Sequence, residues 1–272
     1  MLRPRVPEKL RELVAKFRIN EAHYKSAKFL ETQVRVEFIN PLLRLLGWDV
    51  DNEAGYAQDY KDVIHELHIG DRRHIDYAFK VGESYKFIIE AKRPSVELAD
   101  SAEAVYQARK YAHDTKIRLV IVTDFEEFAI YEGFNKYDRA PEPTDGVEYR
   151  RVFYCLYTEY VRYWSFLYSL ISRKSVMLGL HDHLLARLEE VKKSITDSIY
   201  TVREFNLLYS IAQSFGGEDY TVEQDVEIHQ EIPLLPAAGR PSEPAPPIAA
   251  MPLQAAPVGP QKVAFYLGPV FS

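Results

Sequence analysis

Two adjoining runs of β-forming residues, 73–81 and 85–92, constrain the fold of this chain more than any other feature. Both runs are rich in aromatic and branched side chains, and Gly82-Glu83-Ser84 separates them, which predicts an antiparallel hairpin. Each run also carries an acid inside it, Asp76 in the first and Glu90 in the second. Strand interiors disfavour acids, so these two carboxylates need a partner or a chemical role.

The side-chain alternation of the hairpin predicts where these acids lie. A three-residue loop would pair Val81 with Tyr85, and the same register would place Asp76 directly opposite Glu90. Directly opposed residues have Cβ atoms about 4.5–5.5 Å apart. Lys92 falls on the same face as Glu90. The opposite face collects a row of apolar residues expected to be core: Tyr77, Phe79, Val81, Tyr85, Phe87 and Ile89.

Two carboxylates this close repel each other, so one of them is protonated unless a cation lies between them. Mg²⁺ is a suitable cation, because it takes one or two carboxylates together with waters and substrate phosphate. A lysine beside such a site can orient water or stabilise developing negative charge. The competing interpretation is structural: Lys92 forms a surface salt bridge that neutralises Asp76 and Glu90 on a solvated face.

The remaining pattern predicts an α/β fold, with a mixed central sheet flanked by helices and a helical C-terminal extension. Apolar spacing predicts helices at 7–17 and 26–48, with a break or restart at Pro41 and an end at Gly47. A helix at 101–114, a strand at 118–123, a turn at 124–127 and a strand at 128–134 follow. The segment 159–190 is predicted to be mostly helical, its aromatic residues packing against the core.

Composition and short motifs exclude several kinds of site and several cellular locations. The sequence has a single cysteine, Cys155, which excludes a disulfide framework and a cysteine-based metal site, and which we expect to be a small packed residue. His181-Asp182-His183 is expected to be solvated rather than a metal site. No apolar run approaches the roughly 18 residues that a membrane span needs. The charged start of the sequence lacks the apolar region of a secretory signal, so the expected location is cytoplasmic.

The acid–acid–lysine arrangement resembles the PD-(D/E)xK nuclease superfamily, whose signature is an aspartate followed by Glu-x-Lys on the next strand. Residues 30–180 look like the N-terminal endonuclease domain of type I restriction R subunits and, more closely, of fused type IIG restriction–modification enzymes. The resemblance is carried by five blocks in order: "ETQVRVEFINPLLRLLGWDV", "HIDYAFKVGESYKFIIEAKRPSVEL", "YQARKYA", "LVIVTDFEEFAIYE" and "SRKSVMLGLHD".

This resemblance implies roles for particular residues. Asp76 and Glu90 would be the metal-binding acids and Lys92 the catalytic lysine, with Mg²⁺, or alternatively Mn²⁺, as cofactor and double-stranded DNA as substrate. Gln107 and Tyr111 match a Gln-x-x-x-Tyr motif, and their i,i+4 spacing puts both on one helix face. Glu31 matches an acid that the family tends to retain.

The sequence also predicts a domain organisation. An N-terminal helical segment at 1–24 and a mostly helical extension at 159–235 flank a core at 25–158, which the resemblance implies is a nuclease domain. Residues 236–272 carry only Arg240, Glu243 and Lys262 as charges and are rich in proline and alanine, so a disordered tail is predicted.

The sequence departs from the family at two points. Ile75, rather than proline, precedes Asp76, and the methyltransferase and motor motifs of the larger enzymes do not occur. We therefore expect a nuclease domain that is a truncated relative or works with a separate specificity or methyltransferase subunit. Two alternatives are a catalytically weak or inactive DNA-binding module of a restriction or defence complex, and a nuclease directed at damaged or structured DNA.

Overall fold

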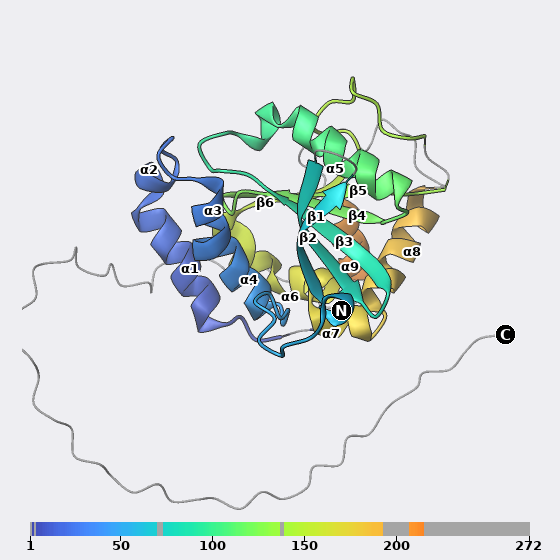
Figure 1. The fold of residues 1–272 in the computed structure, drawn as a ribbon, viewed down its shortest axis with the longest axis horizontal. Helices are drawn as coiled ribbons and strands as arrows, with labels where there is room; N and C mark the ends of the chain where they lie inside the picture. Colours follow the sequence, from blue (N-terminus) through green and yellow to red (C-terminus); the bar gives the residue numbers. More distant parts are fainter. Residues whose placement is uncertain (1, 3, 70–72, 137–138, 193–206, 215–272) are drawn as a thin grey trace, which may run out of the picture. The chain divides into compact units, whose positions relative to one another are not determined.

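Six strands form one mixed sheet in the computed structural model, which describes residues 2, 4–69, 73–136, 139–192 and 207–214 (Figure 1). The strands lie in chain order, and every neighbouring pair is antiparallel except β3 and β4, which are parallel. Their bounds are β1 Val63–Ile69, β2 Arg73–Val81, β3 Ser84–Ala91, β4 Leu119–Thr123, β5 Glu127–Glu132 and β6 Arg151–Leu156. The predicted α/β class with a mixed central sheet is confirmed.

Helices cover both faces of the sheet (Figure 1). On one face, α5 (Ala102–Asp114), the connection between the parallel strands, packs Val105, Ala108 and Ala112 against the sheet. The other face is covered by helices from both ends of the described chain: α1 Glu8–Ile19, α2 Glu21–Tyr24, α3 Glu31–Val34, α4 Asn40–Leu45, α6 Tyr160–Ile171, α7 Arg173–Met177, α8 Leu180–Lys192 and α9 Leu207–Ser214. Short 3₁₀ turns are η2 Gln58–Tyr60, η3 Leu98–Asp100 and η4 Tyr157–Glu159.

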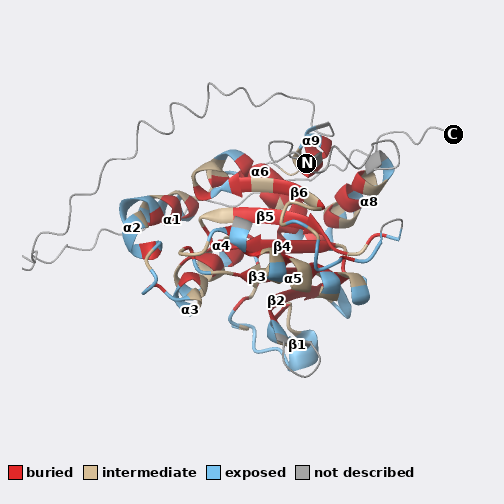
Figure 2. Cartoon of the chain, turned by 90° about the horizontal axis from the view of Figure 1, so that it is seen from above, coloured by how far each residue is buried: buried red, intermediate tan, exposed pale blue. Residues whose placement is uncertain are grey.

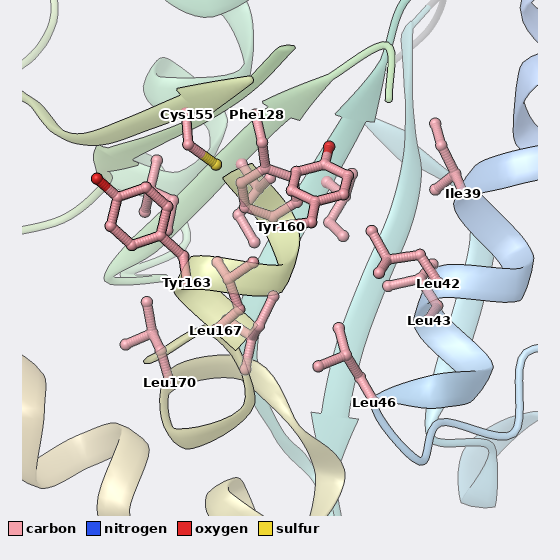
Figure 3. Close-up of a cluster of buried hydrophobic side chains, with 14 of the residues drawn as sticks. Ile39, Leu42, Leu43, Leu46, Phe128, Cys155, Tyr160, Tyr163, Leu167 and Leu170 are labelled. Carbon is pink, nitrogen blue, oxygen red and sulfur yellow. The ribbon is translucent and has the colours of Figure 1, made fainter. Parts of the chain in front are cut away.

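The larger core lies between the sheet and the helices opposite α5. Figure 2 shows the central strands as almost wholly buried, with exposed residues on the outer faces of the helices. Figure 3 shows Leu42 and Leu43 of α4 and Leu46, which follows it, in one cluster with Tyr160 and Leu167 of α6. Helices far apart in the sequence therefore share one apolar core. Cys155 on β6 is fully buried within it, as predicted.

A wide helical turn joins α3 to α4. Residues Arg35–Ile39 form a π-helical turn, η1, in which the Asn40 N–H donates to the Arg35 carbonyl, five residues earlier. Pro41, which has no N–H to donate, follows this turn directly. The chain stays helical from Glu31 to Leu45, so the predicted break or restart at Pro41 is wrong and only the π-helical turn precedes the proline. The predicted end at Gly47, whose φ is +87°, is confirmed. The predicted helix start at 26 is wrong, because the helix begins at Glu31, after a turn.

The β2–β3 hairpin turns in two residues, not the predicted three. Val81 pairs with Ser84 around a Gly82-Glu83 turn, and Gly82 has φ +61°. A β-bulge then inserts one extra residue of β3, so that Tyr77 pairs with Ile89, as the predicted register requires. Tyr85 lies on the turn side of this bulge and is 37% exposed, so its predicted place in the core was wrong.

Two strands were not predicted, the edge strand β1 and β6. Only β6 has a recognisable pattern, the apolar run "RVFYCL", whereas β1, "VIHELHI", mixes apolar residues with histidine and glutamate without strict alternation. The prediction for His181 was wrong, because its ring is buried and its Nδ1 lies 2.8 Å from the Leu170 carbonyl. Burial lowers the pKa of His181, which makes it a neutral packing residue.

The predicted boundaries near residues 24 and 158 stay predictions, and the proposed tail at 236–272 lies outside the described residues. No helix in the described part of the chain combines the length and apolarity needed to cross a bilayer.

Replacing Gly133 with alanine should destabilise the fold. A Cβ at this position would lie 2.3 Å from the Ile117 carbonyl oxygen and 2.7 Å from the Ala112 Cβ. Neither atom is the end of a flexible side chain, so we expect a loss of about 1–3 kcal/mol in the free energy of unfolding, measured by urea titration. Gly146→Ala is the matched control, because its Cβ would meet open space. Equal stability of the two variants would contradict this packing.

Candidate active site

Asp76 lies on β2, one residue beyond the pairing of Tyr77 with Ile89, and Glu90 lies near the end of β3. The two acids are therefore on adjacent antiparallel strands, as predicted. Asp76 is buried, and its Oδ2 accepts a hydrogen bond of 2.7 Å from the Ala91 N–H. The Asp76 carboxylate thus reaches across to the backbone of the strand that carries Glu90.

Lys92 follows directly after β3, and the structure pairs it with Glu90. Its Nζ lies 2.7 Å from Glu90 Oε1, and the two side chains are only 21% and 16% exposed. The Lys92 N–H donates to the Thr123 carbonyl on β4 at 2.9 Å, which holds the chain after β3 against the next strand. Because the pair is largely buried, it differs from the solvated surface salt bridge considered above.

Glu31 at the start of α3 belongs to the same electrostatic group. Its pKa is raised by burial, lowered by Lys92 and raised by Asp76. The ionised Glu31 in turn contributes to the raised pKa of Glu90. The helix opposite α5 therefore brings a third carboxylate to the two acids of the hairpin.

Arg35, on η1, was not predicted as a site residue. Its Nη1 lies 3.0 Å from Asp76 Oδ1, and it also contacts Glu66 on β1 and the Tyr77 hydroxyl on β2. Its position four residues after Glu31 puts both on one face of the helix. That spacing is the only sequence signal that could have found it.

Burial dominates the electrostatics of the cluster. It raises the pKa of Glu90 to about 7, with Asp76 and Glu31 adding to the rise and Lys92 opposing it. Burial also raises the pKa of Asp76, against the lowering effects of the Ala91 N–H and Arg35. For Lys92, burial lowers the pKa, but the neighbouring acids outweigh it and the net shift is upward. Three carboxylates thus share a site where the charged form is costly.

A groove of about 440 Å³ runs between the hairpin and α5, next to Glu90. Gln107 and Tyr111 both line it, so the structure brings these two predicted residues to the side of the site that Glu90 faces. The full lining is His74, Ile75, Glu90, Ala104, Gln107, Ala108, Lys110, Tyr111, Asp114 and Thr115. Asp76 and Glu31 do not line this groove.

The donor set fits a hard divalent cation. Asp76 and Glu90 offer only carboxylate oxygens, and burial raises the pKa of both although Arg35 and Lys92 oppose the rise. Among the described residues, no three histidine, cysteine or acidic side chains are gathered closely enough to hold a metal by themselves. A cation here would therefore take two carboxylates and fill its other positions with water and phosphate oxygens, which is the usual pattern for Mg²⁺.

Comparison with known proteins finds similarity to a restriction enzyme. The chain is 32% identical over 187 residues to the type II restriction enzyme and methyltransferase RM.Eco57I of Escherichia coli. The match covers 67% of this chain but only 18% of that enzyme. No protein-family model matches the sequence, and no solved structure matches it. The chain is thus similar in sequence to a restriction enzyme, over less than a fifth of that enzyme's length.

Proposed function

We propose that this chain is a Mg²⁺-dependent DNA endonuclease domain of the restriction type, with a site of the PD-(D/E)xK kind. The observation that carries the proposal is the grouping of buried Asp76 on β2 with half-buried Glu90 and Lys92 at the end of β3, with Glu31 beside them. The similarity to a restriction enzyme and methyltransferase supports DNA as the substrate. Mn²⁺ is the expected substitute for Mg²⁺, because both prefer oxygen ligands.

Each residue has a role that its position supports. Asp76 and Glu90 would hold the cation, which, when bound, polarises a phosphodiester and acidifies a water. Lys92 lies within hydrogen-bond distance of Glu90, so its ammonium group is placed to orient the attacking water or to stabilise the negative charge that develops on the phosphate. Gln107 and Tyr111 would contact the DNA backbone from the groove beside Glu90.

A second candidate is a DNA-binding module with weak or no catalysis. It is favoured by one observation: both oxygens of Asp76 already accept hydrogen bonds, from Ala91 and Arg35. Under either proposal, a separate specificity or methyltransferase subunit is a candidate partner. The matched protein is both a restriction enzyme and a methyltransferase, and the match covers only 18% of its length.

Incubation of supercoiled plasmid with the purified chain separates the two proposals. We expect nicked and linear DNA in Mg²⁺ or Mn²⁺ and no change in the presence of a chelator. Binding of DNA that resists the chelator, with no cleavage at any metal concentration, would support the inactive module and contradict the nuclease.

A further inference from the structure

Arg35 is anchored on three sides. Its guanidinium contacts Glu66 on β1, and its Nε donates to the Tyr77 hydroxyl at 3.2 Å. The guanidinium also lies over the Tyr77 ring, 4.8 Å from the ring centroid. Tyr77 is itself fixed, because its hydroxyl donates to Asn40 Oδ1 at 2.7 Å. A planar guanidinium held by several partners has little freedom to move.

The group that Arg35 holds in turn is the Asp76 carboxylate. Arg35 Nη1 lies 3.0 Å from Oδ1, while the Ala91 N–H lies 2.7 Å from Oδ2. One bond on each oxygen fixes the rotation of the carboxylate plane. An ionised carboxylate has about four lone-pair sites, so each oxygen keeps a free lone pair for another ligand.

We propose that Arg35 is a positioning residue that sets the orientation of the Asp76 carboxylate. In the context of the proposed nuclease function, on which this consequence rests, the fixed carboxylate presents its remaining lone pairs to the cation. Arg35 also ties the helix that carries Glu31 to the strands that carry Asp76 and Glu66. Removal of a residue that hydrogen-bonds a metal ligand typically lowers metal affinity by about 10–100-fold.

Arg35→Lys is the decisive variant, because it keeps the charge and removes the planar fork. A lysine amine cannot bond Glu66, Tyr77 and Asp76 with the same fixed geometry. Arg44→Lys is the matched control, since Arg44 pairs with Asp51 at 2.7 Å on an exposed part of α4. Glu66→Gln is a second test variant. Glu66 is 50% exposed and forms an ion pair with Arg35, so the change weakens the anchoring of Arg35 without altering Arg35 or Asp76.

Two readouts test the proposal. Mn²⁺ titration followed by electron paramagnetic resonance should show about tenfold weaker binding in Arg35→Lys and a smaller loss in Glu66→Gln. Amide hydrogen exchange, measured by NMR without metal, should be faster at Ala91 in both variants, because the Ala91 N–H donates to Asp76. Arg44→Lys should match the wild type in both measurements.

The outcomes separate this inference from the proposed function. If the wild type binds no Mn²⁺, the proposed function fails, and the Ala91 exchange rate alone decides the role of Arg35. Ala91 exchange in Arg35→Lys that equals the wild-type rate would overturn the inference. If Arg35→Lys does not fold, Glu66→Gln decides by the same readouts: faster Ala91 exchange supports the inference and an unchanged rate overturns it.

Discussion

Replacing Lys92 with alanine is expected to reduce metal-dependent DNA cleavage to background, a loss of about 100-fold or more. The substitution removes the ammonium group next to Glu90 and touches neither apolar core cluster. Near-ultraviolet circular dichroism should therefore show a folded protein. Single-turnover cleavage of plasmid at saturating Mg²⁺ gives the rate, and Mn²⁺ titration shows whether the metal still binds.

Lys86→Ala is a well-matched control for this variant. Lys86 lies on β3, the strand that Lys92 directly follows; its side chain is 19% exposed, and it pairs with Asp182 at 2.9 Å. Lys86 therefore has an exposure and an acidic partner similar to those of Lys92, but lies six residues earlier in the chain. We expect its cleavage rate to match the wild type. Equal loss of activity in both lysine variants would show that Lys92 has no special role.

Replacing Glu90 with glutamine should stabilise the metal-free protein at pH 8 and abolish cleavage. The pKa of Glu90 is raised from an ordinary 4.5 to about 7. Folding therefore disfavours the charged form of Glu90 relative to the protonated form by about 3 kcal/mol. The pKa of about 7 already includes the favourable pairing with Lys92, so about 3 kcal/mol is the upper limit, and we expect a gain of about 1–3 kcal/mol in the free energy of unfolding.

The pH dependence of this stabilisation has a fixed sign. Below pH 4.5, Glu90 is protonated in both the folded and the unfolded chain, and the variant and the wild type should be equally stable. Between pH 4.5 and about 7, the unfolded chain releases the proton while the folded chain retains it, so the wild type loses stability as the pH rises. Above this window the difference between the two proteins should be constant.

Urea unfolding of both proteins in chelator at pH 4.5 and pH 8 measures this difference. Glu12→Gln, at an exposed ion pair on α1, is the control and should show little change. Added Mg²⁺ should stabilise the wild type at pH 8 and not Glu90→Gln, because a ligand stabilises only the state that binds it. A variant that is less stable than the wild type at pH 8 would contradict the costly charge at Glu90.

The hairpin shows how far the sequence predicts the site. Alternation placed Asp76 and Glu90 on adjacent antiparallel strands, and the structure agrees at Tyr77 and Ile89. The predicted turn was one residue too long, and a bulge in β3 compensates for that residue. Both the turn and the bulge depend on local backbone geometry, which side-chain alternation does not encode. Tyr85 was misplaced for this reason.

Other parts of the site depend on tertiary packing and have no local signal. Arg35 reaches Asp76 only because η1 packs beside β1 and β2. The groove beside Glu90 likewise exists because α5 lies across the hairpin. The burial of His181 was missed because its polar neighbours suggested a solvated segment. The hydrogen-bond partner that permits the burial, the Leu170 carbonyl, cannot be read from this short motif. Spacing within one element and the register of the hairpin were predictable, whereas contacts of the helices with the sheet were not.

Anomalous diffraction from crystals soaked in Mn²⁺ tests the central claim most directly. The proposed nuclease site predicts a peak bound by carboxylate oxygens of Asp76 and Glu90 at roughly 2 Å, the length of bonds from small divalent cations to oxygen. Waters should complete the coordination, and Lys92 should remain beside the ion without binding it. A well-occupied Mn²⁺ peak elsewhere in the chain, with Asp76 still held by Arg35 and Glu90 by Lys92 and no ion between the acids, would contradict the account.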